Sequence, residues 1–230
     1  MMERVIKVDK ALTLSPGRRI LVLYILLGAG GLWHLLGVFG TTMRVLAGPL
    51  IIFMGVWIGW EYRAQVSAGN RTRLYLWMVG VVVGTFLLEW IGIATGVIFG
   101  SYRYEDTLQP QVFMVPVAIG FAWLTVLLGA QTLARLVLGR FRFWISLLLP
   151  VVGGFFMVGF DFLLEPAAQQ LGYWSWSGGA VPVRNYLVWF FAGVIILTIG
   201  QMAQVFPQRP VRFAGHTYIA QVMYFGLALM

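Results

Sequence analysis

Long apolar runs separated by short polar or basic segments dominate the chain. Each run is close to the ~20 residues that an α-helix needs to cross the hydrocarbon core of a bilayer. The last run is interrupted by the polar residues His216, Thr217 and Gln221. We predict membrane-spanning helices at about Ile20–Gly40, Val45–Trp60, Leu74–Phe99, Val112–Leu133, Phe143–Leu164, Tyr186–Val205 and Val211–Met230.

This pattern predicts an all-α integral membrane protein that folds as a seven-transmembrane-helix bundle. A single domain spans residues 1–230, with a polar and basic N-terminal segment at 1–19 and the bundle at 20–230. The composition agrees, because 60% of the residues are hydrophobic and only 10% are charged. No soluble domain of this length needs so much apolar sequence.

The distribution of basic residues predicts the orientation. All but three of the 16 Lys and Arg residues lie in the N-terminal segment and in the second, fourth and sixth loops. The exceptions are Arg44, Arg103 and Arg184. Because cytoplasmic loops are enriched in Lys and Arg, we expect a cytoplasmic N-terminus and an external C-terminus. The net charge of +8 therefore reflects topology, and no nucleic-acid partner is expected.

Five carboxyl groups fall on the predicted outer side. Glu105 and Asp106 lie in the loop after the third span, whereas Glu89, Asp161 and Glu165 lie within apolar runs or at their ends. A carboxylate within an apolar span costs about 2.5–3.5 kcal/mol on insertion scales and is rarely left unpaired. Glu89 is therefore a candidate general acid or base. The structural alternative is a hydrogen bond to a neighbouring helix, or an ion pair with Arg103 or Arg184.

Asp161 and Glu165 are four residues apart, which places both on one helix face, about 6 Å apart along the axis. In a shared cavity, the repulsion between them would leave an acid beside a base. Alternatively, both are ordinary interfacial charges, and Pro166 ends the helix.

Aromatic residues gather toward the same outer side. They form either an interfacial belt or the lining of a pocket that stabilises a cation. Asn185, where the sixth run begins, either caps that helix or orients a water molecule. Gly92, Gly96 and Gly100 predict close helix packing. The aromatic residues are Trp90, Trp123, Trp174, Trp176, Trp189, Tyr102, Tyr104 and Tyr173.

The sequence predicts no metal site. It has no cysteine, so thiolate ligands are excluded. Its two histidines, His34 and His216, have no partner spacing typical of a histidine-based metal cluster.

With these residues in view, the chain resembles the membrane carotenoid hydratase family. Founding members of that family act on bacterioruberin precursors in archaea and on lycopene or gamma-carotene in bacteria. The resemblance covers about residues 85–190. The blocks that carry it are Glu89–Gly96, Phe99–Tyr104, Val115–Pro116 with Trp123, Asp161–Ala168, Gly172–Trp176, and Pro182 and Asn185 through Trp189.

The resemblance implies addition of water to the terminal double bond of an acyclic carotenoid end group, which gives a tertiary alcohol. Glu89 and Asp161 would act as acid and base, in unassigned order, while Glu165 and Asn185 position the water. This chemistry requires no metal, nicotinamide or flavin cofactor. The aromatic residues expected to contact substrate, together with Asn185, are Trp90, Tyr102, Tyr104, Trp123, Trp174, Trp176 and Trp189.

The partners implied are a lycopene-like or gamma-carotene-like acyclic carotenoid, the lipid bilayer, and other membrane enzymes of carotenoid synthesis. The expected location is the cytoplasmic membrane of a bacterium or archaeon.

Three other functions remain open. A carotenoid cyclase would begin with the same protonation. A prenyltransferase would need two Asp-rich motifs for magnesium and diphosphate, and the chain offers only Asp161 with Glu165 and the adjacent Glu105 and Asp106. The third is a carotenoid-binding or transport protein without catalysis. A retinal receptor is excluded, because both lysines precede the first span.

Overall fold

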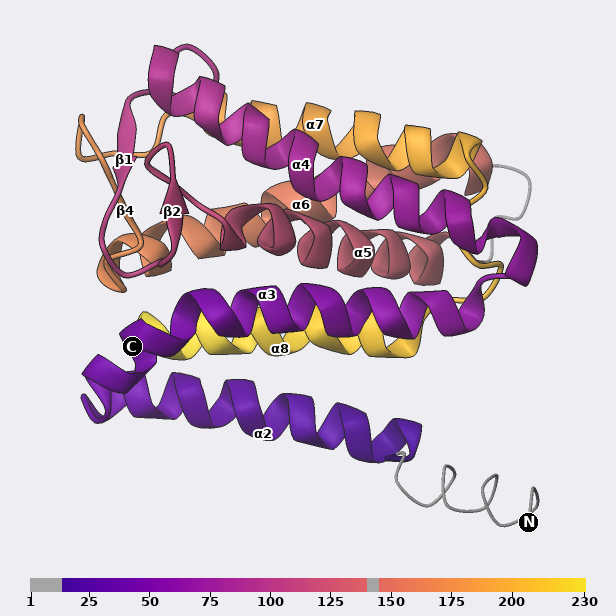
Figure 1. Cartoon of the computed structure of the whole chain (residues 1–230), viewed down its shortest axis with the longest axis horizontal. Coiled ribbons are helices and arrows are strands. Elements are labelled where there is room, and N and C mark those ends of the chain that lie inside the picture. The colour runs from indigo at the N-terminus through magenta and orange to yellow at the C-terminus, as the bar shows by residue number, and fades with distance from the viewer. Residues whose placement is uncertain (1–13, 140–144) are drawn as a thin grey trace.

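Each predicted apolar run contains an α-helix in the computed structural model, which describes residues 14–139 and 145–230 (Figure 1). Most of the predicted N-terminal segment and the predicted start of the fifth span lie outside the described residues. The helices are α2 (Pro16–Leu35), α3 (Gly40–Gln65), α4 (Arg71–Thr95), α5 (Ala118–Leu138), α6 (Ile145–Gln170), α7 (Val183–Met202) and α8 (Arg212–Ala228). The remaining elements are a 3-10 turn η1 (Ala68–Asn70) and the strands β1 (Tyr102–Tyr104), β2 (Gln111–Val112), β3 (Val115–Pro116) and β4 (Trp174–Trp176).

The protein is a multi-pass helical membrane protein. Within the described residues, the six helices α2 to α7 are long and apolar enough to cross a bilayer. The seventh run is helical as expected, but α8 has only 17 residues and falls short of that length. Its crossing of the membrane therefore remains a prediction, as does the external C-terminus.

The connections between α4 and α5 depart from the predicted helical runs. Helix α4 stops at Thr95 because Gly96 adopts a left-handed conformation, with φ +64°, and caps the helix. Residues 111–116, expected at the start of a span, form the hairpin of β2 and β3.

Pro166 lies inside α6, which continues to Gln170, so the interpretation that it ends the helix is wrong.

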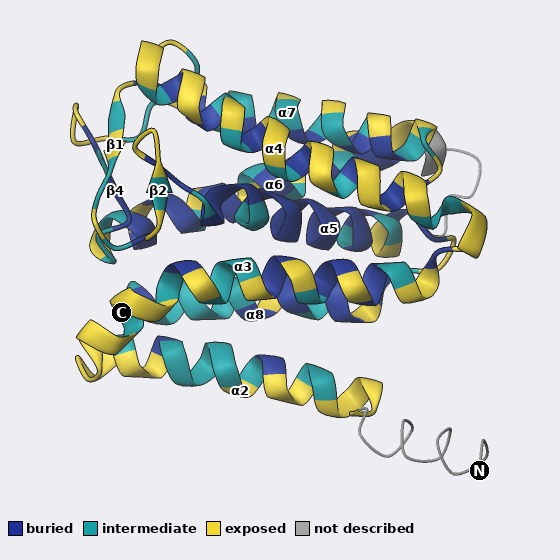
Figure 2. Cartoon of the chain, viewed as in Figure 1, coloured by how far each residue is buried: buried dark blue, intermediate teal, exposed yellow. Residues whose placement is uncertain are grey.

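Helix α5 forms the core of the bundle. In its apolar stretch 67% of the residues are buried, against 11% in α2. It packs against α3, α4, α6 and α8, and Figure 2 shows it dark blue along most of its length. The outer helices carry exposed apolar side chains such as Leu76, Phe155 and Phe191. Such side chains suit contact with lipid tails.

Two tyrosine–histidine pairs tie α2 to α8. Tyr24 Oη lies 3.1 Å from His216 Nδ1, and His34 Nε2 lies 2.9 Å from Tyr224 Oη. Helix α2 supplies the tyrosine of the first pair and the histidine of the second, and α8 supplies the other residue of each pair. Both histidines therefore have a structural role, because each satisfies a polar group between two spans.

The connections between α3 and α4 and between α7 and α8, which contain or adjoin arginines, lie at one end of the bundle, and the strands lie at the other (Figure 1). This follows from the antiparallel order of the helices. Arg63, Arg71 and Arg135 lie at or near the helix ends opposite to the strands. The arrangement agrees with the charge pattern, whereas the compartment that each end faces remains a prediction.

Close backbone contact between α4 and α5 gives a first test. A Cβ atom on Gly120 would lie 2.3 Å from the carbonyl oxygen of Val82, whereas one on Gly84 would meet nothing within 4 Å. We expect Gly120→Ala to destabilise the protein by about 1–3 kcal/mol, the usual cost of overpacking. Gly84→Ala should leave stability equal or higher, because alanine favours helix. Thermal unfolding in detergent measures both, and equal midpoints for the two variants would contradict the packing described here.

Candidate active site

A two-stranded antiparallel ribbon covers the strand end of the bundle (Figure 1). Tyr102 pairs with Trp176, and Tyr104 pairs with Trp174. Because side chains alternate along a strand, these four rings share one face of the ribbon. All four line a cavity on the bundle side. We call Tyr102, Tyr104, Trp174 and Trp176 the aromatic ribbon.

The opposite face of the ribbon is held by Glu105. Its Oε1 accepts hydrogen bonds from Ser175 Oγ at 2.7 Å and from Arg103 Nε at 3.1 Å. The hydrogen bond from Ser175 and that from Arg103 lower the pKa of the Glu105 carboxyl group. This carboxylate faces away from the cavity and does not line it.

The three glycines predicted to mediate helix packing instead shape the chain segment that leads from α4 into β1. A Cβ atom on Gly92 would lie 2.6 Å from the ring of Phe99, and one on Gly100 would lie 2.7 Å from Pro182. Gly96 caps α4 in the left-handed conformation. The close contacts involve connecting segments and not neighbouring helices, so the helix-packing prediction is wrong.

Glu89 lies buried near the end of α4 and accepts three hydrogen bonds. Its Oε2 accepts from the hydroxyl groups of Tyr102 and Tyr104, the latter at 3.0 Å. Its Oε1 accepts from Trp123 Nε1 of α5 at 2.9 Å. The ring of Trp123 stacks on Trp189 of α7 with 4.0 Å between centroids.

The ion pair considered for Glu89 is wrong. Arg103 pairs with Glu105, and Arg184 donates to the backbone oxygen of Gly96. The hydrogen bond to a neighbouring helix, the other structural alternative, is present through Trp123.

Burial raises the pKa of both Tyr102 and Tyr104, and the charge of Glu89 raises each further. Both hydroxyl groups therefore remain protonated at any physiological pH. They act as permanent donors to the carboxylate of Glu89.

Glu165 accepts three hydrogen bonds of its own. Its Oε2 accepts from Trp174 Nε1 at 2.9 Å and from Trp176 Nε1 at 2.7 Å, and its Oε1 accepts from Asn185 Nδ2 at 3.1 Å. The aromatic ribbon thus supplies two hydroxyl donors to Glu89 and two indole donors to Glu165.

Asn185 bridges the two acids of α6. Its Nδ2 donates to Asp161 Oδ2 at 2.7 Å as well as to Glu165. The side chain makes no cap for α7, which begins after Pro182. Asp161 and Glu165 are both buried, so the interpretation as ordinary interfacial charges is wrong.

Asp161 differs from the other two carboxyl groups in its hydrogen bonding. Its Oδ2 has the single donor Asn185. Its Oδ1 is buried and has no hydrogen-bond partner among the residues that the structure describes. A buried acceptor without a donor is costly, so Asp161 is the least compensated of the three as an anion.

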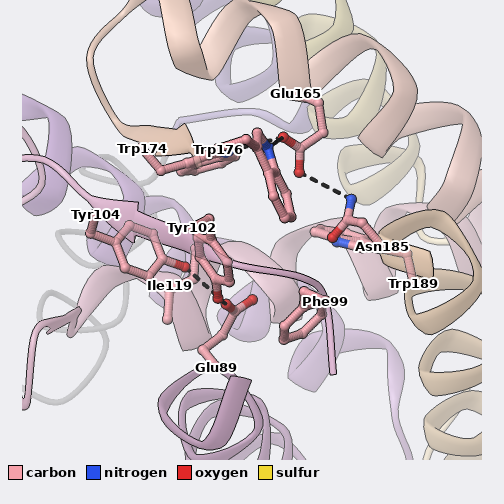
Figure 3. Close-up of a pocket in the computed structure, with 10 residues that line it drawn as sticks. All are labelled: Glu89, Phe99, Tyr102, Tyr104, Ile119, Glu165, Trp174, Trp176, Asn185 and Trp189. Carbon is pink, nitrogen blue, oxygen red and sulfur yellow. Dashed lines mark hydrogen bonds between the residues drawn. The ribbon is translucent and has the colours of Figure 1, made fainter. Parts of the chain in front are cut away.

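Glu89 and Glu165 face each other across a cavity of about 20 Å³ (Figure 3). This volume is the space open to the centre of a water-sized sphere, and a cavity needs roughly 10–15 Å³ of it to hold one water molecule. This one therefore accepts a single water and excludes an isoprenoid end group unless it widens. The residues that line it are Glu89, Phe99, Tyr102, Tyr104, Ile119, Glu165, Trp174, Trp176, Asn185 and Trp189.

Three predicted site residues do not line the cavity. Asp161 lies behind Asn185, and Trp123 lies behind Glu89 and Trp189. Trp90 is not brought to the site: the residue is 40% exposed, and its ring packs on Phe113.

The sequence reasoning missed Phe99 and Ile119 as lining residues. Phe99 precedes the Tyr-x-Tyr strand, so recognising the strand would have indicated it. Ile119 is one apolar residue within an apolar run and gives no such signal. Among the described residues, no group of three or more His, Cys, Asp or Glu side chains could hold a metal ion.

Comparison with known proteins gives a family match. The sequence model of the family described as "Carotenoid biosynthesis protein" matches residues 24–230. Searches of curated proteins and of solved structures returned no match. The matched range includes every residue that lines the cavity.

The indole donors of the aromatic ribbon can be tested separately from its rings. Trp176→Phe keeps an aromatic ring but leaves Glu165 Oε2 with one donor fewer. We expect a loss of about 1.5–3 kcal/mol in unfolding free energy, the usual contribution of a hydrogen bond to a charged group. The exposed Trp90→Phe should change stability by less than about 0.5 kcal/mol. Denaturation in detergent gives both values, and equal effects would argue against the hydrogen bond.

Proposed function

The chain belongs to the carotenoid biosynthesis protein family, and we propose that it hydrates the terminal double bond of an acyclic carotenoid end group. The observation that carries this proposal is the cavity with room for one water between buried carboxyl groups, at the end of an apolar bundle. Acyclic carotenes such as lycopene are hydrocarbons, so a site embedded in the membrane can receive them directly from lipid. The reaction adds one water and produces a tertiary alcohol.

Asp161 is the proton donor in this mechanism. Two carboxyl groups bridged by a single amide hold one proton between them more readily than two negative charges. Because Glu165 already has three donors and Asp161 has one, the proton resides on Asp161. The terminal double bond takes this proton at its less substituted carbon, and the positive charge forms on the tertiary carbon.

Aromatic faces and a carboxylate stabilise this cation. Trp189, Tyr102 and Trp176 line the cavity, and ring faces attract cations, most strongly in a dry site. Glu89 is held as an anion by three donors that are already in place before the charge develops. Preorganised groups of this kind supply much of the stabilisation in enzymes.

Water capture completes the reaction. Glu165 and Asn185 position the water, whose oxygen bonds to the tertiary carbon while Glu89 accepts one of its protons. The net change is the addition of water, and proton exchange with solvent returns both carboxyl groups to their starting states. Since the cavity holds one water and Asp161 lies behind Asn185, protonation of the end group requires the aromatic side chains and Asn185 to move apart.

Pigment analysis tests the reaction. Expressed in cells that make lycopene, the wild-type protein should yield pigments heavier by one water per modified end. Glu89→Gln and Asp161→Asn should each reduce this product about 100-fold or more, the range for loss of a general acid or base. Glu105→Gln, on the outer face of the ribbon, should retain full activity. A product isomeric with lycopene would instead indicate a cyclase, and binding without any product would indicate a carrier.

Deuterium labelling separates the acid from the base. Purified protein in D₂O, supplied with lycopene in detergent, should place deuterium on the protonated carbon. Asp161→Asn should abolish this label, because no cation forms. Glu89→Gln should still give labelled isomers without the hydroxyl group, because protonation precedes water capture. The reverse pattern would exchange the two roles, and full activity of both variants would refute the site.

A further inference from the structure

A second cavity lies at the end of the bundle opposite to the aromatic ribbon. Its volume is about 600 Å³, which falls within the range of small-molecule sites. It lies where α3, α5 and α7 end and where the chain turns toward α4 and α8. The lining residues are Gln65, Val66, Ser67, Asn70, Arg135, Gln201, Gln204, Phe206, Pro207, Gln208 and Arg209.

Hydrogen bonds to the α7–α8 connection hold this cavity in shape. Asn70 Nδ2, just before α4, donates to the backbone oxygen of Gln204 at 3.1 Å. Arg135 Nη1, in the last turn of α5, donates to the backbone oxygen of Gln208 at 3.3 Å. Both contacts join segments more than 70 residues apart in sequence.

The lining chemistry favours an anion. Among the described residues, those that line the cavity include two arginines, Arg135 and Arg209, and five amide side chains, but no carboxylate. The Nε atom of Arg135 is buried and has no hydrogen-bond partner in the part of the chain that the structure describes. An arginine with a donor left over can take a further acceptor, and its planar fork matches phosphate oxygens.

Helix dipoles reduce this positive charge without cancelling it. The ends of α3, α5 and α7 each contribute roughly half a negative charge, and the starts of α4 and α8 contribute the opposite sign. The two arginine charges together exceed the small net negative charge of these helix termini. The cavity therefore keeps a positive potential.

We propose that this cavity binds a phosphate group at the membrane surface, with Arg135 and Arg209 as its cationic contacts. The phosphate belongs either to an anionic phospholipid headgroup or to a soluble phosphate compound. The site is separate from the candidate active site, and its existence does not depend on the proposed hydration.

Ligand-dependent thermal stability in a neutral detergent tests the proposal. The full-length protein is titrated with phosphatidylglycerol, with diacylglycerol of the same chains, and with sodium pyrophosphate against chloride at equal ionic strength. The proposal expects saturable stabilisation by phosphatidylglycerol, by pyrophosphate or by both, and none by diacylglycerol. Stabilisation by the lipid alone identifies a headgroup site, and stabilisation by pyrophosphate identifies a site for soluble phosphate.

Three matched variants locate the binding. Arg135→Gln and Arg209→Gln should each weaken the affinity about tenfold or more, as expected for a lost charge-assisted hydrogen bond. Arg73→Gln removes an exposed charge near the same end but outside the cavity lining, and should leave the affinity unchanged. Each shift is measured against the same variant without ligand, so a change in basal stability does not obscure the result. Equal weakening in all three variants, or no saturable stabilisation by either phosphate compound, would overturn the proposal.

Discussion

The structure depends on hydrogen bonds to carboxyl groups that are buried within an apolar bundle. In a medium with little water, a charged group without donors is expensive. Glu89 and Glu165 each receive three donors, drawn from two strands, α5 and α7. The aromatic ribbon is the segment that makes this possible, because one face of it carries two hydroxyl and two indole donors.

This requirement also explains how the helix ends are brought together. Glu89 joins α4 to α5 through Trp123, and Asn185 joins α7 to the two acids of α6. The ribbon connects the segment after α4 with the segment after α6. The hydrogen bonds that compensate the buried carboxyl groups therefore also fix the relative positions of α4, α5, α6 and α7. In the same arrangement, Asp161 Oδ1 accepts no hydrogen bond from any residue that the structure describes.

The two ends of the bundle have opposite chemistry. Buried acids and aromatic rings gather at the end with the strands, whereas arginines and amides line the larger cavity at the other end. A small cavity that admits one water suits proton chemistry on an apolar substrate. A wide cavity with arginine at a membrane surface suits an anionic headgroup. One chain can hold both because an apolar core about the thickness of a bilayer separates them.

The helical membrane architecture follows from the sequence alone, because apolar runs of the length of a bilayer have few other stable structures. The sequence also singles out Glu89, Asp161 and Glu165, because ionisable residues in or beside apolar spans need partners. Asn185 stands out as a polar residue where an apolar run begins.

The partners of these groups, in contrast, come from segments far apart in the chain. Tyr102 and Tyr104 alternate with period two, as do Trp174 and Trp176, but the pairing of strands 70 residues apart cannot be derived from either segment alone. The register places the hydroxyl groups on Glu89 and the indoles on Glu165, and it directs Arg103 away from both. Trp90, adjacent to Glu89, faces outward because neighbouring residues on a helix point in different directions. Such choices depend on contacts between distant segments, and local patterns of polarity do not encode them.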